Sequence, residues 1–300
     1  MYDFIEDKDW KEILDRLSAI REQEDYSSEN IEYIRKQLQS PDDRVRGGAA
    51  LTAEGCLFEP YILDMLLDVA ENDSSDVIRK AAIQSLGAMI YEGVMQNLEE
   101  GTGSDTNLEY YEEWDELQAE SLKEDYLRVK NLMYSILQNE FESREVREAA
   151  LNAVSDLGFN EEVREWIEDF IESEYLSSQL VALHAMGKYP QYWEDQIARF
   201  LTPAAAKPLI MEAISSSYSS DSQELAHRIE HLLEMDDPDI LCYALQTLAN
   251  IGQDADLGRV FQEFSLHEDE RVRDTAKKAI EHFTNRNFSD YMGNELGMEE

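Results

Sequence analysis

The sequence has little cysteine, proline or glycine, and no long apolar run. Its two cysteines, Cys56 and Cys242, lie far apart in the chain, so we expect two free, packed thiols, with no disulfide and no cysteine-rich metal site. With only 13 Gly and 6 Pro in 300 residues, the chain can form one elongated helical core. No stretch approaches about 18 uncharged apolar residues, and the first residues, MYDFIEDKDW, are acidic where a signal peptide is basic. These features predict a cytoplasmic protein without a membrane segment.

Basic residues are also scarce. The chain has 26 Lys and Arg against 66 Asp and Glu, so its formal net charge at pH 7 is −40. DNA, RNA and anionic membranes are each bound through a basic surface, so this charge argues against all three as partners. Three interpretations of the acidity stay open: solvation in a salty cytoplasm, mimicry of a polyanion, and a docking surface for a basic protein.

What the sequence does contain is one short helical phrase, repeated. In the copy SREVREAALNAVSDLG, residues 143–158, apolar and mostly small residues recur at spacings of three and four, which is typical of one face of a helix. Ser143 or the acidic residue after it is predicted to cap this helix, and Gly158 to end it in a left-handed turn. Related phrases occur at residues 42–51, 74–87, 176–187, 237–252 and 269–280. They recur at about 31 to 34 residues or at multiples of that interval, and such a period indicates a solenoid.

These phrases resemble the second helix of short HEAT-like repeats, of the type that phycobilin lyases also carry. The resemblance implies an all-α fold, an α-solenoid that is a superhelix of about seven HEAT-like helix pairs. The predicted pairs are 29–39 with 43–57, 59–71 with 75–91, 116–139 with 144–157, 160–173 with 176–188, 191–201 with 203–217, 222–235 with 238–251, and 254–265 with 269–283.

The remaining segments frame these pairs. We expect a single solenoid over residues 1–283, in which an amphipathic helix at 8–24 caps the first pair. Residues 92–115 are rich in acids and are interpreted as an acidic insert, although a degenerate repeat within 92–125 also fits the spacing. Residues 284–300 are predicted to form a weakly ordered acidic tail.

The solvent-facing side of the second helices is the predicted binding surface, because in HEAT-like solenoids that side lines the concave groove. Helical spacing places six contact residues there: Leu51, Tyr91, Asn152, Leu180, His184 and Gln246. The same spacing also places Glu148, Ser155 and Ala249 on it. The insert adds three aromatic residues, Tyr110, Tyr111 and Trp114, which could either anchor a basic partner or pack the insert onto the solenoid.

Two further patterns involve charged or metal-binding residue types. Four arginines, Arg46, Arg79, Arg147 and Arg273, recur near acids at the repeat period, which predicts a ladder of ion pairs joining adjacent repeats rather than an anion site. The segment HRIEH, residues 227–231, matches the H-x-x-E-H motif of zinc peptidases, in which both histidines bind zinc and the glutamate is the base. Leu225, Ile229, Leu232 and Leu233 mark the buried side of this helix, so we predict two surface histidines.

No catalytic, cofactor-binding or metal-binding residue is therefore predicted. The predicted function is a non-enzymatic scaffold or adaptor that binds a protein or peptide in its groove. The expected partner is basic, with no nucleic acid and no membrane involved, and the scaffold is expected to be a monomer. Two alternatives stay open: a bilin lyase or isomerase, because those enzymes share the short repeat, and an antitoxin-like or polyanion-mimicking inhibitor of a basic protein.

Overall fold

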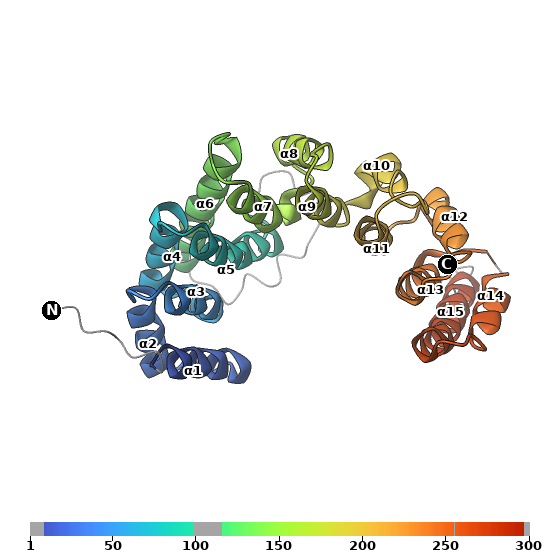
Figure 1. Cartoon of the computed structure of the whole chain (residues 1–300), viewed down its shortest axis with the longest axis horizontal. Helices are drawn as coiled ribbons and strands as arrows, with labels where there is room; N and C mark the ends of the chain where they lie inside the picture. The colour runs from blue at the N-terminus through green and yellow to red at the C-terminus, as the bar shows by residue number, and fades with distance from the viewer. Residues whose placement is uncertain (1–8, 99–115, 255, 297–300) are drawn as a thin grey trace. The chain divides into compact units, whose positions relative to one another are not determined.

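The computed structural model describes residues 9–98, 116–254 and 256–296 (Figure 1). Over these residues the chain forms α-helices and short 3-10 helices and no strands. The α-helices are α1 (Asp9–Gln23), α2 (Ser28–Leu38), α3 (Asp43–Thr52), α4 (Pro60–Asn72), α5 (Asp76–Met95), α6 (Glu116–Gln138), α7 (Arg144–Ala153), α8 (Glu161–Ile171), α9 (Leu176–Met186), α10 (Glu194–Ala198), α11 (Lys207–Ser216), α12 (Gln223–Leu232), α13 (Pro238–Ile251), α14 (Leu257–Phe264) and α15 (Glu270–Leu296). The predicted all-α class is confirmed.

Helices α2 to α15 follow one another as seven pairs in the part of the chain that the structure describes. We call the first helix of each pair the A helix and the second the B helix. Successive B helices pack against one another, α3 on α5 and α5 on α7, and likewise α9 on α11, α11 on α13 and α13 on α15. Each pair contributes one apolar face that only its neighbours can cover, which is the logic of a solenoid. The predicted repeat architecture is therefore confirmed.

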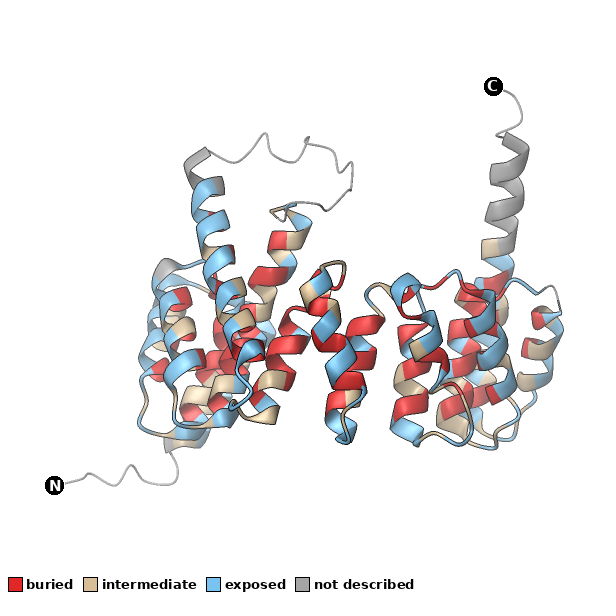
Figure 2. Cartoon of the chain, turned by 90° about the horizontal axis from the view of Figure 1, so that it is seen from above, coloured by how far each residue is buried: buried red, intermediate tan, exposed pale blue. Residues whose placement is uncertain are grey.

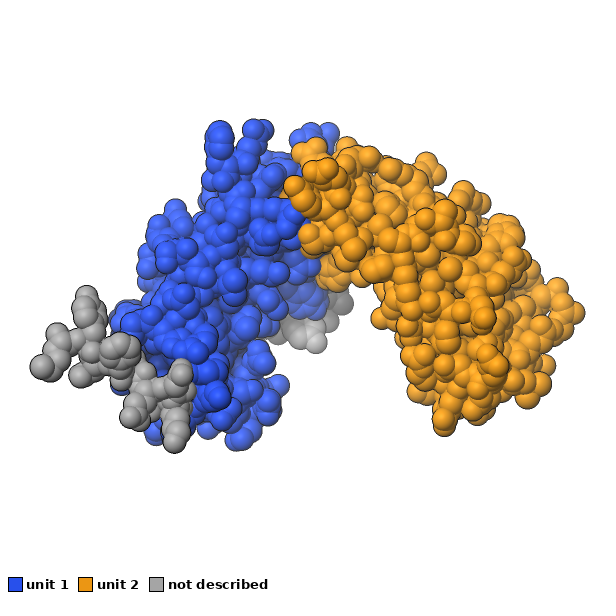
Figure 3. All heavy atoms as spheres, viewed as in Figure 1, with its two compact units in different colours: residues 1–166 blue, residues 167–300 orange. Residues whose placement is uncertain are grey.

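The chain divides into two compact units, unit 1 (Met1–Trp166) and unit 2 (Ile167–Glu300), shown in Figure 3. Each unit has its own buried residues along the facing sides of its helices (Figure 2). In unit 1, α1 packs against the first B helix, α3. The role of this helix as a cap stays a prediction. The single solenoid over residues 1–283 stays a prediction. The predicted acidic insert lies mostly in residues 99–115, outside the described residues.

Small residues allow the B helices to approach closely. A Cβ atom added to Gly87 of α5 would lie 3.4 Å from the Cα and Cβ atoms of Ala153 in α7. One added to Gly187, just after α9, would lie 2.8 Å from the Cα atom of Ser216 in α11, which is too close for any side chain. Alanines fill most other contact positions, among them the fully buried Ala82 and Ala150. This explains why the repeated phrase is rich in alanine and glycine.

The helix ends follow the sequence signals only in part. The predicted cap Ser143 is confirmed, since its Oγ accepts a hydrogen bond from the Val146 N–H at 3.4 Å. The predicted left-handed turn at Gly158 is wrong: its φ is −61°, because α7 passes into a short 3-10 turn that ends the repeat instead. Left-handed residues follow two other helices: Glu24 after α1, with φ 51°, and Asn97 after α5, with φ 56°. At Asn97 the Leu98 N–H donates to the Gly93 carbonyl and closes the helix.

The C-terminal helix is longer than the sequence pattern predicts. The last pair was expected to end at residue 283, but α15 continues through Leu296. The repeated phrase on which the prediction rested ends before that residue, so it could not show how far the helix runs. Helix α15 packs on α13 and α14, and a helix that is already nucleated by packing extends at little further cost.

The arginine ladder is confirmed at two of its four positions. Arg46 in α3 pairs with Asp73 of the next repeat, with Nε and Oδ2 2.8 Å apart. Arg79 in α5 binds Glu142 of the following pair through both Nη atoms, at 2.9 Å and 2.5 Å. Each arginine also donates to a carbonyl at the end of its own A helix or just beyond it, Ser40 for Arg46 and Ala70 for Arg79.

The other two predicted ladder arginines make contacts of a different kind. Arg147 donates to the Leu137 carbonyl at 3.2 Å, and Arg273 donates to the His267 carbonyl at 2.7 Å. Both carbonyls lie at the end of an A helix or just after it, where backbone acceptors lack helical partners. These contacts fasten the two helices of a pair, as the carbonyl contacts of Arg46 and Arg79 also do, and the ion pairs of Arg46 and Arg79 join one pair to the next.

We expect Glu142→Gln to lower the free energy of unfolding by about 1.5–3 kcal/mol at pH 7, the usual contribution of hydrogen bonds to a charged group. Both side chains of the Arg79–Glu142 pair are largely buried, at 13% and 12% exposure. The hydrogen bond from Arg79 lowers the pKa of Glu142 below its ordinary value of 4.5. The stabilisation is therefore complete above that value and is lost as the pH falls through the folded-state pKa, so the two proteins should converge in acid.

Urea denaturation of both proteins from neutral to acidic pH measures this difference. The matched control is Glu32→Gln, because the Glu32–Arg35 pair is also short, with Nη2 and Oε1 2.8 Å apart, but is exposed. An exposed pair contributes about 0–1 kcal/mol, so this control should scarcely change stability. Equal losses in the two variants would contradict the structural role of the buried pair.

Candidate interaction surface

Three neighbouring surface cavities meet at one side chain, Tyr218, at the exposed ends of the B helices of unit 2. Their volumes are about 460, 370 and 300 Å³. Tyr218 lines all three, and Gln246 of α13 lines two of them. We call the exposed residues around these cavities the Tyr218 surface: Tyr218, Tyr243, Gln246, Lys278 and His282.

A serine-rich segment, SSSYSSDS at residues 215–222, presents the tyrosine ring. Its buried hydroxyls bind back to the scaffold: Ser216 Oγ donates to the Leu183 carbonyl of α9 at 2.7 Å, and Ser222 Oγ donates to Glu194 at 2.9 Å. Ser217 Oγ donates to the Ala213 carbonyl at 2.8 Å. These small polar side chains satisfy the backbone where α11 ends. Tyr218 remains 41% exposed, although large aromatic rings are usually buried.

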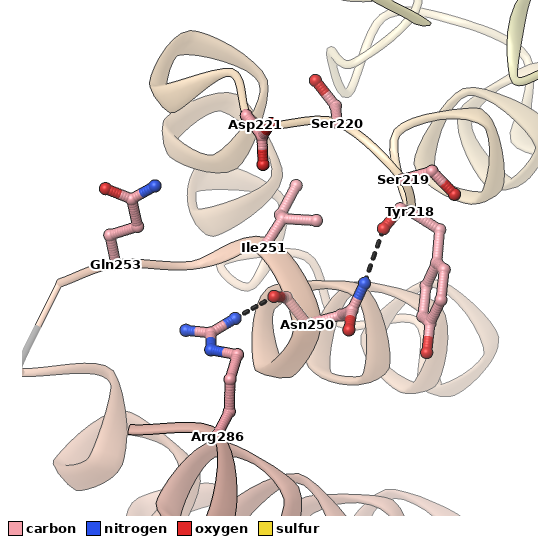
Figure 4. A pocket seen from close by; sticks show the side chains of 8 residues that line it. All are labelled: Tyr218, Ser219, Ser220, Asp221, Asn250, Ile251, Gln253 and Arg286. Atoms are coloured by element: carbon pink, nitrogen blue, oxygen red, sulfur yellow. Dashed lines mark hydrogen bonds between the residues drawn. The ribbon is translucent and has the colours of Figure 1, made fainter. Parts of the chain in front are cut away.

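Polar contacts hold the three B helices in register beneath this ring (Figure 4). The Asn250 side-chain amide of α13 donates to the Tyr218 backbone carbonyl at 2.7 Å. His282 Nε2 of α15 lies 3.3 Å from Asn250 Oδ1, and Arg286 donates to the backbone carbonyl of Asn250. The Asn250 side chain of α13 thus fixes the backbone at Tyr218, and His282 and Arg286 of α15 hold Asn250 in place.

The charge on this surface differs from that of the chain as a whole. The cavity between α13 and α15 is lined by Lys278 and His282 together with neutral residues. The largest cavity carries one acid, Asp221, and one base, Arg286. The chain as a whole has a net charge of −40, but these cavities have no excess of acids. They are therefore suited to contact with neutral side chains, or with side chains of both charges, on a partner.

The six predicted contact residues on helices divide between the two units. In unit 1, Tyr91 and Asn152 are exposed and Leu51 is half-buried. In unit 2, His184 and Gln246 are exposed and Leu180 is half-buried, and His184 Nδ1 lies 3.4 Å from Glu212 Oε1 of α11. Of these residues only Gln246 lines the cavities around Tyr218.

Three residues were wrongly placed on the solvent-facing side of the B helices. Glu148, Ser155 and Ala249 were expected to face solvent and are buried. Each B helix packs against other B helices as well as against its own A helix. Fewer of its positions are therefore exposed than on a helix with a single buried face. Tyr110, Tyr111 and Trp114 lie outside the described residues.

Tyr218 and Tyr243 were missed because the sequence reasoning followed helical spacing alone. Tyr218 follows the last residue of α11, outside any helical register. The signal that could have found it is a single large aromatic residue in a run of serines, since such a residue has no apolar neighbours in sequence to pack against.

The H-x-x-E-H motif lies on α12, an A helix of unit 2. Its two histidines are exposed, as predicted, while Leu225, Ile229 and Leu232 are buried. The sequence did not predict that the two Nε2 atoms lie 3.1 Å apart. Among the described side chains, no group of three or more His, Cys, Asp or Glu converges on a point where they could share a metal ion.

Comparison with known proteins supports the repeat assignment. Residues 31–110, which contain most of α2 and all of α3 to α5, match the family model described as HEAT repeats. No curated protein matches the sequence. None of the described helices is long and apolar enough to cross a membrane. The predicted resemblance to HEAT-repeat proteins is confirmed.

Several solved structures are similar to this chain. One is the Escherichia coli protein YibA, with 14% identity and a TM-score of 0.49 over 94% of this chain and 99% of that one. Another is the complex of CpcE and CpcF of phycocyanin lyase from Nostoc sp. PCC7120, with 16% identity and a TM-score of 0.38 over 85% and 93%. A third is a designed armadillo repeat protein in complex with the peptide (KR)4, with 18% identity and a TM-score of 0.34 over 83% and 98%.

Proposed function

We propose that this chain is a non-enzymatic scaffold that binds a protein or peptide on the Tyr218 surface of unit 2. The observation that carries the proposal is the meeting of three cavities at one exposed tyrosine whose backbone is fixed by its neighbours. Tyrosine is enriched at interface hot spots because a rigid ring gives a large contact area at low entropic cost. The exposed surfaces of helical repeats commonly serve as extended binding sites.

The proposed partner is basic overall, and it is bound by a monomer in the cytoplasm. A net charge of −40 attracts basic proteins over about a Debye length and repels acidic ones. Local contact on the Tyr218 surface is then made by neutral and aromatic groups, since Lys278 disfavours a cationic side chain there. Association should therefore slow as salt rises, whereas dissociation should depend mainly on Tyr218 and its neighbours.

The remaining predicted contact residues stay proposals of their own. Leu180 and His184 are proposed to extend the contact along α9 within unit 2. Leu51, Tyr91 and Asn152 are proposed contacts on the B helices of unit 1, and Tyr110, Tyr111 and Trp114 are proposed aromatic contacts beside acids. The bilin lyase and inhibitor alternatives stay predictions. Co-expression with bilin and a phycobiliprotein tests the first, because a lyase would yield a coloured product, and stoichiometric capture of one basic enzyme tests the second.

Selection of a phage-displayed peptide library on the full chain tests the proposed site. We expect enriched peptides with an aromatic or neutral core flanked by Lys or Arg, and we expect their enrichment to disappear on a Tyr218→Ala, Gln246→Ala double variant. Peptides that bind both proteins equally would place binding elsewhere. No enrichment over an immobilised control protein would contradict the proposed peptide binding.

A further inference from the structure

The exposed face of α12 brings two imidazoles together in a way that the scaffold function does not use. His227 and His231 are one helical turn apart, and their rings stand edge to face, with centroids 4.5 Å apart at an interplanar angle of 72°. The two Nε2 atoms face each other at 3.1 Å. The His227 side chain is 63% exposed, so this arrangement is open to solvent and to small ions.

This separation suits two ligands on one metal ion. If each Nε2 binds at about 2.05 Å, a typical metal–imidazole distance, the two bonds meet at the ion with an angle of about 98°. That value lies between the right angle of neighbouring ligands in a square-planar site and the wider tetrahedral angle. The two rings therefore need little movement to chelate an ion.

The surrounding charges also favour a cation. Glu230 Oε2 lies 3.9 Å from His227 Nδ1, where a small movement lets the carboxylate accept the Nδ1 proton and leaves the Nε2 lone pair free. Arg228 is the one lysine or arginine of α12, and Glu224 accepts a hydrogen bond from its Nε at 2.7 Å and offsets its charge. The charge of −40 on the chain raises the local concentration of cations further.

We infer that His227 and His231 form an open, two-imidazole site for a divalent transition-metal ion, which binds Cu²⁺ more tightly than Ni²⁺ or Zn²⁺. Imidazole is a good ligand for all three ions, and the general affinity order puts Cu²⁺ first. Two side chains supply two coordination positions, and water fills the others. This differs from the zinc-peptidase interpretation of the motif, which requires a third protein ligand. The inference is independent of the Tyr218 surface.

The test is titration of the metal-free full chain with Cu²⁺, followed by calorimetry and electron paramagnetic resonance. We expect one equivalent of Cu²⁺ to bind with a spectrum that shows coupling to nitrogen. His227→Ala and His231→Ala should each weaken binding by more than about tenfold, because losing a ligand costs at least as much as losing an outer-shell partner. Ni²⁺, which thiols do not reduce, serves as a second probe and should bind more weakly.

The matched control is His267→Ala, which removes a half-buried histidine of unit 2 that belongs neither to α12 nor to the Tyr218 surface and should leave the affinity unchanged. All the variants can be compared as folded proteins, since circular dichroism and melting temperature report any loss of structure. One-equivalent binding that persists in the His227→Ala, His231→Ala variant would overturn the site. So would the absence of binding by the wild type, which would leave a hydrogen bond between the two rings as the explanation of their contact.

Discussion

Ala150→Asp in α7 is expected to unfold most of unit 1 or to lower its melting temperature by about 10 °C or more. Ala150 is fully buried, and α7 packs closely on α5, where Gly87 already approaches Ala153. A carboxylate at position 150 would have neither room nor a partner, and burying an unpaired charge destabilises a fold by more than about 4 kcal/mol. A domain is stable by only about 5–15 kcal/mol, so most of that stability would be lost.

The control is Asn152→Asp, which places the same new carboxylate on the same helix at an exposed position. It should change the stability by less than about 0.5 kcal/mol, as surface substitutions usually do. Thermal melting followed by circular dichroism measures both variants. Since the chain has two compact units, unit 2 is expected to keep its own transition in Ala150→Asp. Equal melting temperatures for the two variants would contradict the close packing of α5 and α7.

The helix pairs could be predicted from the sequence because every pair must meet the same packing requirement. A B helix must pack closely against its neighbours, so small apolar residues recur at helical spacing, and all seven predicted pairs are found. Features that depend on one contact were not predictable. Where one longer helix was expected, the chain forms a 3-10 turn at Pro190–Tyr192 and then the short α10, and Trp193 and Ile197 are buried there.

The candidate site was predictable to a smaller extent, for a related reason. Helical spacing identifies residues that lie on one face of one helix, and it placed Gln246 correctly on the exposed side of α13. It says nothing about which exposed residues of different helices meet, or about side chains in the turns between helices. Tyr218 lies in such a turn, and its position depends on the Asn250 amide, about one repeat further along the chain.

Tyr218→Ala is expected to raise the Kd of a selected peptide by about 30-fold or more, mainly through faster dissociation. Truncating an aromatic hot-spot residue costs at least about 2 kcal/mol, which corresponds to that factor. The substitution should leave the fold intact, because Asn250 binds the backbone carbonyl of residue 218 and not its ring. Surface plasmon resonance with the peptide that the library selection yields would measure both rate constants.

Two further variants show whether the loss of affinity comes from the Tyr218 ring itself or from removing any exposed tyrosine. Tyr218→Phe keeps the contact area and should stay within about threefold of the wild type, since the ring supplies most of the contact area. Tyr61→Ala removes a more exposed tyrosine, 73% against 41%, from α4 in unit 1 and should not change the Kd. If Tyr61→Ala weakened binding as much as Tyr218→Ala, the peptide would be bound by scattered aromatic contacts, and the Tyr218 surface would not be the site. If the association rate fell with salt while Tyr218→Ala left dissociation unchanged, the acidity of the chain alone would account for binding.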